Sequence, residues 1–350
     1  MRDKGESKMT DKDQCSSDHE AATVPQLGEH CLGALRDAGF DSSLLDKLLA
    51  SITTAGKLVD RIPDSAQVRF PATRPAPEPM THEFILAHWT GVTRRLSLAQ
   101  LAADRALRDL LVGFVGALQT RNAVTACLCA RASIENAAAY DSLSRFFAAR
   151  KERIEADILP YFKDELQPDD LATLYDRPLI DELIRFCYGA RLWPTGDCPT
   201  TVAEWKAWRK HSRYESKQAT DDDGDEQSIA GQLLDALSMN QRNVLSLLEK
   251  VAKRSRNMEV LGLYDMLSEF CHPNADNRSI GTKANRLEEG IAIVDVVGTR
   301  SWTPGTIKGT RLSMIGIIEA IDIHVGANDA IHDSAQELCE HLALSSLRQT

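Results

Sequence analysis

The stretch from residue 122 to residue 149 constrains the fold more than any other, because it carries the strongest helical pattern in the chain. Successive residues of an α-helix are separated by about 100° around its axis. This spacing places an apolar stripe along the segment, made of Val124, Cys127, Leu128, Ile134 and Ala138. A long helix with such a stripe buries it against other helices, so the pattern predicts a bundle.

Helical spacing recurs over most of the chain. We expect further helices at about 27–38 and 42–60, one that begins at 81, and others at about 97–119, 200–215, 228–252, 255–272, 283–299, 310–326 and 328–346. Residues 168–188 are expected to form short helices. Pro160 is expected to end the helical region that precedes it. Residues 291–297 favour a strand on propensity, but a lone strand has no partner, so we expect a buried helix there. The predicted fold is all-α: a multi-helix bundle with peripheral helices and a disordered N-terminal tail.

Composition shifts divide the chain into six parts. Residues 1–26 are mostly polar and should form the disordered tail, and four prolines in residues 71–79 exclude helix and sheet there. The acidic run at 221–226 is typical of a solvated loop. The predicted parts are a tail (1–26), a helical pair (27–60), a proline-rich connector (61–80), a helical region (81–215), an acidic linker (216–227) and a second helical region (228–350) that packs on the first.

Charge and cysteine content exclude several classes of protein. The net charge of −10 argues against a protein that coats nucleic acid with its whole surface. The eight cysteines form no C-x-x-C pair and no zinc-type cluster, which indicates reduced thiols and no metal or cofactor. Neither a secretory signal nor a membrane-spanning run is visible, so we expect a cytoplasmic protein without membrane contact. Sequence signatures of phosphate loops, serine hydrolases and zinc proteases are also missing.

Arg131 and Glu135 are candidate site residues because they fall within the apolar stripe of 122–149, one helical turn apart. An isolated buried charge is costly, so both side chains need partners. Two interpretations remain open. They can form a structural ion pair that fixes the helix register, or they can line a polar pocket between helices.

His272 is a second candidate, because it ends a helix that Pro273 prevents from continuing. A helix C-terminus favours a protonated imidazole. The projection places Asp265, Glu269 and His272 on one face, opposite an apolar face formed by Val260, Leu263, Tyr264, Leu267, Phe270 and Cys271. Asn274 and Arg278 follow at once and would add phosphate-binding groups near the same end. The alternative is an ordinary solvated face with a histidine that caps its own helix.

A third candidate is the basic stripe Lys206, Lys210, Arg213 and Lys217, which lies near Trp205 and Trp208. Basic side chains beside aromatic rings suit single-stranded nucleic acid, through phosphate attraction and base stacking. The tryptophans lie on a different face, however, where they can also serve as core anchors. A second basic group, Lys250, Lys253, Arg254 and Arg256, follows further along the chain.

Two motifs resemble the HEPN superfamily of small helical domains in prokaryotic defence and toxin systems. One is Arg131-Ala-Ser-Ile-Glu135, and the other is Tyr264-x-x-Leu-Ser-Glu-x-x-His272. The resemblance covers about 122–149 and 228–299. Active members carry an arginine four to six residues before the histidine, whereas this chain has Ser268, Leu267 and Met266 there.

The resemblance implies a protein that binds RNA or a nucleotide in a bacterial defence or toxin role, with a degenerate, metal-independent ribonuclease site. His272 would act as acid or base, and Arg131 or Arg278 would steady the phosphate. The alternative is a non-catalytic helical scaffold that binds a protein partner or forms a homodimer. In that case Arg131, Glu135 and His272 would be structural.

Overall fold

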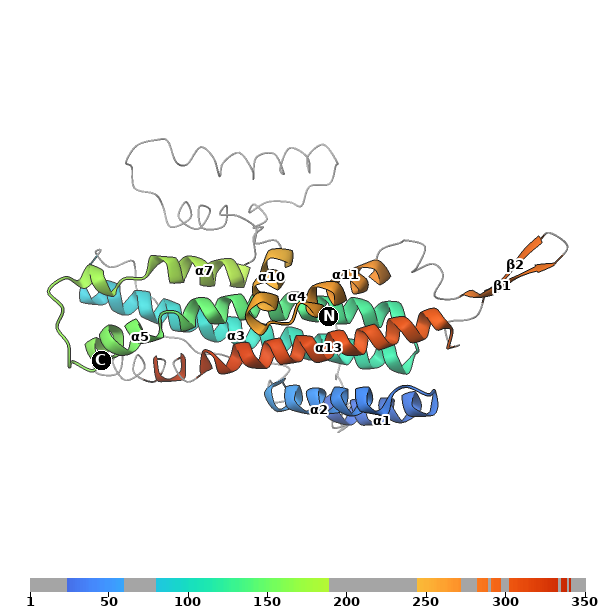
Figure 1. Cartoon of the computed structure of the whole chain (residues 1–350). Coiled ribbons are helices and arrows are strands. Elements are labelled where there is room, and N and C mark those ends of the chain that lie inside the picture. Colours follow the sequence, from blue (N-terminus) through green and yellow to red (C-terminus); the bar gives the residue numbers. More distant parts are fainter. Residues whose placement is uncertain are drawn as a thin grey trace, which may run out of the picture.

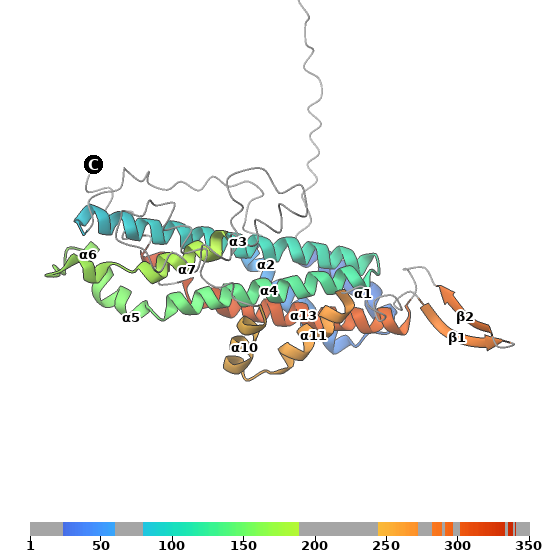
Figure 2. The same cartoon turned by 90° about the horizontal axis from the view of Figure 1, so that it is seen from above.

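Three long helices form the centre of the computed structural model, and they run side by side along the molecule (Figures 1 and 2). These are α3 (His82–Gln119), α4 (Ala123–Ala148) and α13 (Pro304–Asp329). The structure describes residues 24–59, 80–188, 244–271, 282–288, 291–296, 302–332, 335–338 and 340. Within them it confirms the all-α, multi-helix bundle with peripheral helices. No described helix is long and apolar enough to cross a membrane.

Helix α3 is one continuous element, whereas the sequence predicted two helices that meet near residue 97. Thr81 caps its first turn by accepting a hydrogen bond from the backbone N–H of Phe84 at 3.2 Å. The helix then continues to Gln119, because Trp89, Val92, Leu96 and Ala99 are all buried and carry the apolar face through the expected break. At 38 residues, the helix is about 57 Å long.

A tight reversal joins α3 to α4. Arg121 lies in the left-handed region (φ 58°), and the N–H of Asn122 donates to the carbonyl of Ala117 at 2.8 Å. The side chain of Asn122 then caps α4 by accepting from the N–H of Thr125 at 3.1 Å. This turn sets α4 antiparallel to α3, with the short connection typical of a bundle.

Helix α13 packs closely against α4 because glycines face it. A Cβ atom on Gly316 would lie 2.9 Å from Leu267 and 3.1 Å from Ala130. The helix begins at Pro304 with a capping box in which Thr303 and Thr306 exchange hydrogen bonds. The sequence predicted separate helices at 310–326 and 328–346. The first of these begins six residues earlier than predicted, at Pro304, and continues to Asp329. After a turn at Ala330 and Ile331 the chain is helical again at residues 332, 335–338 and 340, where the second helix was predicted.

The remaining helices cover the central three. Helices α1 (Val24–Asp37) and α2 (Ser42–Val59) pack on one side, while α10 (Val244–Ser255) and α11 (Glu259–Cys271) pack on α4 from another (Figure 1). Helix α7 (Arg177–Tyr188) contacts α3 and α4. The shorter elements are α5 (Lys151–Arg153), the π-helix η1 (Ile154–Ile158), α6 (Leu159–Phe162) and the 3-10 helix η2 (Leu171–Leu174).

Pro160 was expected to end the helical region, which continues two residues further, to Phe162. A π-turn over Ile154–Ile158 precedes the proline, and Pro160 lies in the first turn of α6, which continues to Phe162. Helix α6 follows η1 without a break, and the wider π turn, in which the Leu159 N–H donates to the Ile154 carbonyl, comes directly before the proline. The chain reverses only at Asp164, whose φ is 61°.

The predicted helix at 283–299 was wrong, because this segment forms an antiparallel hairpin. Strand β1 (Thr282–Glu288) pairs with β2 (Ile291–Val296), with Leu287 opposite Ala292. The strand-forming residues of β2 therefore do have a partner, supplied by the segment just before them. Figures 1 and 2 show the hairpin beyond the end of the bundle where α13 begins.

The buried apolar residues form two clusters that share all three central helices. The first includes Leu107 to Leu118 of α3, Ala123 to Ala138 of α4 and Met314 to Ile321 of α13. The second includes Ile85 to Ala103 of α3, Tyr140 to Phe147 of α4, and Ala327 of α13. Each central helix therefore crosses from one core to the other.

A polar layer lies at this crossing. His324 is 2% exposed, and its Nε2 lies 2.7 Å from Asp104 Oδ1. The Tyr140 ring lies 4.9 Å from the His324 ring, and its hydroxyl contacts Asn328 Oδ1 at 3.2 Å. Burial, reinforced by the charge of Asp104, raises the pKa of Tyr140. These side chains satisfy one another where α3, α4 and α13 meet, so they fix the axial offset of the three helices.

Candidate functional site

Arg131, Glu135 and Tyr264 converge into one polar group, here called the Arg131 cluster. Arg131 Nε donates to Glu135 Oε1 at 3.0 Å, and its Nη2 contacts the Tyr264 hydroxyl at 3.3 Å. The Tyr264 hydroxyl donates to the same Glu135 oxygen at 2.7 Å. The guanidinium carbon also lies 5.3 Å from the centre of the Tyr264 ring. The three side chains therefore form a closed set of contacts between α4 and α11.

The cluster lies at the edge of the helix interface rather than in the core. The Arg131 and Glu135 side chains are 27% and 31% exposed. Leu128, which the sequence placed on the apolar stripe, is 46% exposed. The buried face of α4 is instead lined by small residues, Ala126, Ala130, Ala137 and Ala138, together with Cys127 and Ile134. The stripe is thus rotated from the predicted one, and both charged side chains keep access to water.

The hydrogen bonds and charges within the Arg131 cluster keep Arg131 protonated. Partial burial alone would lower the pKa of Arg131, but the hydrogen bonds and charges of Tyr264 and Glu135 outweigh it, so the net pKa is raised. Burial and the hydrogen bond to Glu135 raise the pKa of Tyr264, so its hydroxyl stays protonated. Burial also raises the pKa of the Cys271 thiol, although Arg131 opposes this shift. Cys271 is therefore a poor nucleophile at neutral pH.

Helix α11 confirms the predicted apolar face. Val260, Leu263, Leu267 and Phe270 are buried against α4 and α13, while Asp265 and Glu269 are exposed. The acidic face next to Cys271 is therefore exposed, as the alternative interpretation expected. His272, Asn274 and Arg278 lie outside the described residues, so the convergence of His272 with Arg131 stays a prediction.

Tyr264 is the member of the cluster that sequence reasoning missed. It was assigned to the apolar face of α11, which is correct, since the residue is 7% exposed. A buried tyrosine hydroxyl needs a hydrogen-bond partner, and this requirement was the available signal. The pattern of the chain gave no means to identify Glu135 as that partner.

The predicted basic stripe Lys206, Lys210, Arg213 and Lys217 also lies outside the described residues. The second basic group is described. Lys250, Lys253 and Arg256 are exposed on α10 and the turn after it. Arg254 forms an ion pair with the buried carboxylate of Asp141 at 2.5 Å, which attaches α10 to α4.

A second charged group orders the loop before α7. Asp176, 4% exposed, accepts hydrogen bonds from Arg150 Nε at 2.8 Å and Arg153 Nη1 at 3.0 Å. Its other oxygen caps α7 by accepting from the N–H of Leu179 at 3.0 Å. His88 Nε2 accepts from the backbone N–H of Asp176 at 3.2 Å. Every one of these contacts holds the loop in place, so the group is structural.

The described residues hold no group of three or more His, Cys, Asp or Glu side chains placed to bind a metal. Cys31, Cys127, Cys129 and Cys271 are free thiols. The buried Cys127 thiol lies 3.3 Å from the Gly309 carbonyl, and burial raises its pKa to about 12.

Comparisons of the chain with protein-family models, with curated proteins and with solved structures gave no match.

Proposed function

We propose that the protein is HEPN-like and binds RNA or a nucleotide through a surface centred on Arg131, in a cytoplasmic defence or toxin role. One observation carries the proposal: Arg131 is a partly exposed cation, held in one orientation by Glu135 and Tyr264. A positioned arginine presents a rigid fork of donors to a phosphate. Its contact with the aromatic ring and the carboxylate limits the side-chain entropy lost on binding.

The exposed basic residues of α10 extend this surface. Arg254 attaches α10 to α4 at Asp141, ten residues along α4 from Arg131. Ten residues of helix span about 15 Å, close to the length of four stacked nucleotides. Lys250 and Lys253 of α10 would contact RNA backbone phosphates at about that distance from Arg131. The exposed carboxylates of Asp265 and Glu269 repel phosphate, so the bound RNA would follow α4 and α10 rather than the outer face of α11.

Ribonuclease chemistry is the second part of the proposal, and it depends on His272. Glu135 is engaged by both Arg131 and Tyr264, which suits a positioning residue rather than a free general base. His272 follows Cys271, the last residue of α11, so the catalytic acid or base would come from the chain just beyond that helix. Arg131 or Arg278 would stabilise the charge that develops on the phosphate.

Binding is tested with a fluorescently labelled 12-nucleotide single-stranded RNA, followed by fluorescence anisotropy over a range of salt concentrations. The variant Arg131→Gln should weaken binding about tenfold, and Lys250→Gln with Lys253→Gln should reduce the salt dependence by about two phosphate contacts. Lys57→Gln, at an exposed position on α2, is the matched charge control and should change nothing. Equal affinity in all of these proteins would contradict the RNA surface.

Cleavage is tested separately, with labelled RNA in the presence of EDTA. Wild type should cleave, and His272→Ala should not. Equal cleavage by both proteins, or cleavage by neither, would remove the ribonuclease part and leave binding to be judged by the anisotropy experiment.

A helical interaction module is the second candidate, and exposed methionines favour it. Met258, in the turn between α10 and α11, is 58% exposed, and Met266 on α11 is 43% exposed. Methionine side chains adapt to many partner surfaces. If the protein forms a homodimer through the surface that carries Met258 and Met266, the double variant Met258→Lys with Met266→Lys should be a monomer by sedimentation equilibrium where wild type is a dimer. Its RNA binding should persist.

A further inference from the structure

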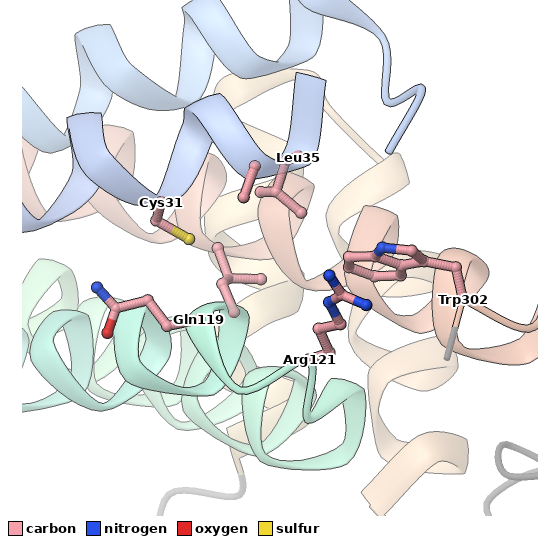
Figure 3. A pocket seen from close by; sticks show the side chains of 7 residues that line it. Cys31, Leu35, Gln119, Arg121 and Trp302 are labelled. Carbon is pink, nitrogen blue, oxygen red and sulfur yellow. The ribbon is translucent and has the colours of Figure 1, made fainter. Parts of the chain in front are cut away.

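An open pocket of about 310 Å³ lies where α1 faces the turn between α3 and α4 (Figure 3). Its walls are lined by Cys31, Ala34 and Leu35 from α1, Leu118 and Gln119 from the last turn of α3, Arg121 from the turn, and Trp302. It shares no residue with the Arg131 cluster. Its volume is at the lower end of the range for small-molecule sites, which suits a ligand of one or two rings.

The inner wall of the pocket is apolar. Cys31, Leu35 and Leu118 are all at most 4% exposed overall, yet each contributes atoms to the lining. Burial raises the pKa of the Cys31 thiol to about 11, so this wall carries no charge at neutral pH. An apolar ring bound against this wall would be removed from water, and it would cover no charged group of the wall.

The outer rim carries one cation beside one aromatic ring. The guanidinium carbon of Arg121 lies 5.4 Å from the centre of the Trp302 ring. Trp302 is itself held by Phe40, whose ring packs edge-on against it with centroids 5.0 Å apart. Figure 3 shows Arg121 extending from the turn toward Trp302, with Cys31 and Leu35 reaching into the same space from α1. The rim is therefore an ordered donor group next to an apolar wall.

The backbone conformation of Arg121 is unusual for an arginine. This residue is in the left-handed region, at the position after a helix end where glycine has the least strain. An arginine at this position places its side chain at the pocket rim.

We propose that this pocket binds a small aromatic monocarboxylate. The carboxylate would pair with the Arg121 guanidinium, which offers parallel N–H donors to both of its oxygens. The ring would lie against Leu35, Leu118 and Cys31, with the Trp302 side chain closing one side. A charged head joined to an apolar body matches the Arg121 guanidinium at the rim and the apolar inner wall.

The probe is 1-naphthoate, titrated into the full-length protein by isothermal titration calorimetry, with 1-naphthalenemethanol as its uncharged counterpart. The expected result is saturable one-to-one binding of the carboxylate, with the alcohol at least tenfold weaker. Absence of saturable binding, or equal affinity for the two compounds, would overturn the proposal.

Two variants locate the binding. Arg121→Gln removes the cation and should weaken 1-naphthoate about tenfold. Ala34→Phe fills the pocket from α1 without changing its charge and should abolish the heat of binding. Arg256→Gln is the matched control, because Arg256 also has a left-handed backbone (φ 54°) in a turn between helices. Circular dichroism confirms that each variant is folded. Full binding by either pocket variant, or an equal loss in Arg256→Gln, would overturn the assignment.

Discussion

The hydroxyl of Tyr264 lies 2.7 Å from Oε1 of Glu135, and this hydrogen bond links α11 to α4 at the surface end of their interface. Arg131 contacts both partners, so one carboxylate oxygen receives two donors from two helices. The ion pair within α4 is thus also a connection between helices. The two interpretations left open by the sequence, a structural pair and a polar group between helices, both describe it.

This relationship predicts energetic coupling between Tyr264 and Glu135. Tyr264→Phe keeps the buried ring and removes only the hydroxyl, so it should lower the free energy of unfolding by about 0.5–1.5 kcal/mol. Glu135→Gln should cost a similar amount. In a double-mutant cycle measured by urea denaturation, the second substitution should cost at least about 0.5 kcal/mol less when the first is present. Strictly additive effects would show that the hydrogen bond contributes nothing.

Two glycines of α13 form a matched pair for testing helix packing. Gly316→Ala forces a Cβ atom to within 2.9 Å of Leu267, so it should destabilise the protein by about 1–3 kcal/mol. Gly326→Ala meets no atom within 4 Å and should stabilise the helix by about 0.5–1 kcal/mol. Urea denaturation at equilibrium measures both. The same sign of effect at both sites would contradict the close approach at Gly316.

His88 predicts a loss of stability in acid. Burial lowers its pKa from 6.5 to about 4; Asp176 opposes this shift, and Arg153 and Arg95 reinforce it. Protonation would also destroy the acceptor that His88 Nε2 offers to the Asp176 N–H. Because the unfolded chain binds this proton more tightly, the stabilisation is complete above about pH 6.5 and is lost as the pH falls toward 4.

The measurement compares wild type with His88→Gln, which has no titrating group at this position. Between pH 7 and pH 4.5, wild type should lose about 2 kcal/mol of unfolding free energy relative to the variant. A constant difference between the two proteins across that range would show that His88 titrates normally in the folded state.

The polar layer predicts a strong effect at Asp104. Asp104→Ala leaves the Nε2 of buried His324 without this partner, so the free energy of unfolding should fall by about 1–3 kcal/mol. Asp109→Ala is the control on the same helix, because that side chain is exposed and its loss should change stability by less than about 0.5 kcal/mol. Similar losses at the two positions would argue against a specific contact with His324.

Local sequence patterns predicted the parts of the fold that local physics determines. The start of a helix at residue 81, the end of α4 near residue 149 and the buried face of α11 all follow from residue preferences and spacing within one segment. The sequence did not predict the rotation of the buried face of α4, because alanine residues in a sequence indicate little about which face of a helix is buried. Ala130 is buried where Gly316 of α13 approaches it, whereas Leu128 is exposed.

Pairing between segments accounts for the remaining differences. The residues of β2 were assigned to a helix because their partner strand, Thr282–Glu288, contains Lys283, Asn285 and Arg286 and has no strand pattern of its own. The hydrogen bond of Tyr264 was missed for a similar reason, since its partner Glu135 is on another helix. Such contacts depend on the three-dimensional arrangement, which periodicity within one segment does not encode.

The polar layer has a thermodynamic consequence. Since α3, α4 and α13 each cross it, separating these helices in either apolar core would also break the hydrogen-bonded layer. The two ends of the bundle should therefore open together as one cooperative unit in hydrogen exchange. A compound bound between α1 and Trp302 would then slow amide exchange in α7, which packs on the other core.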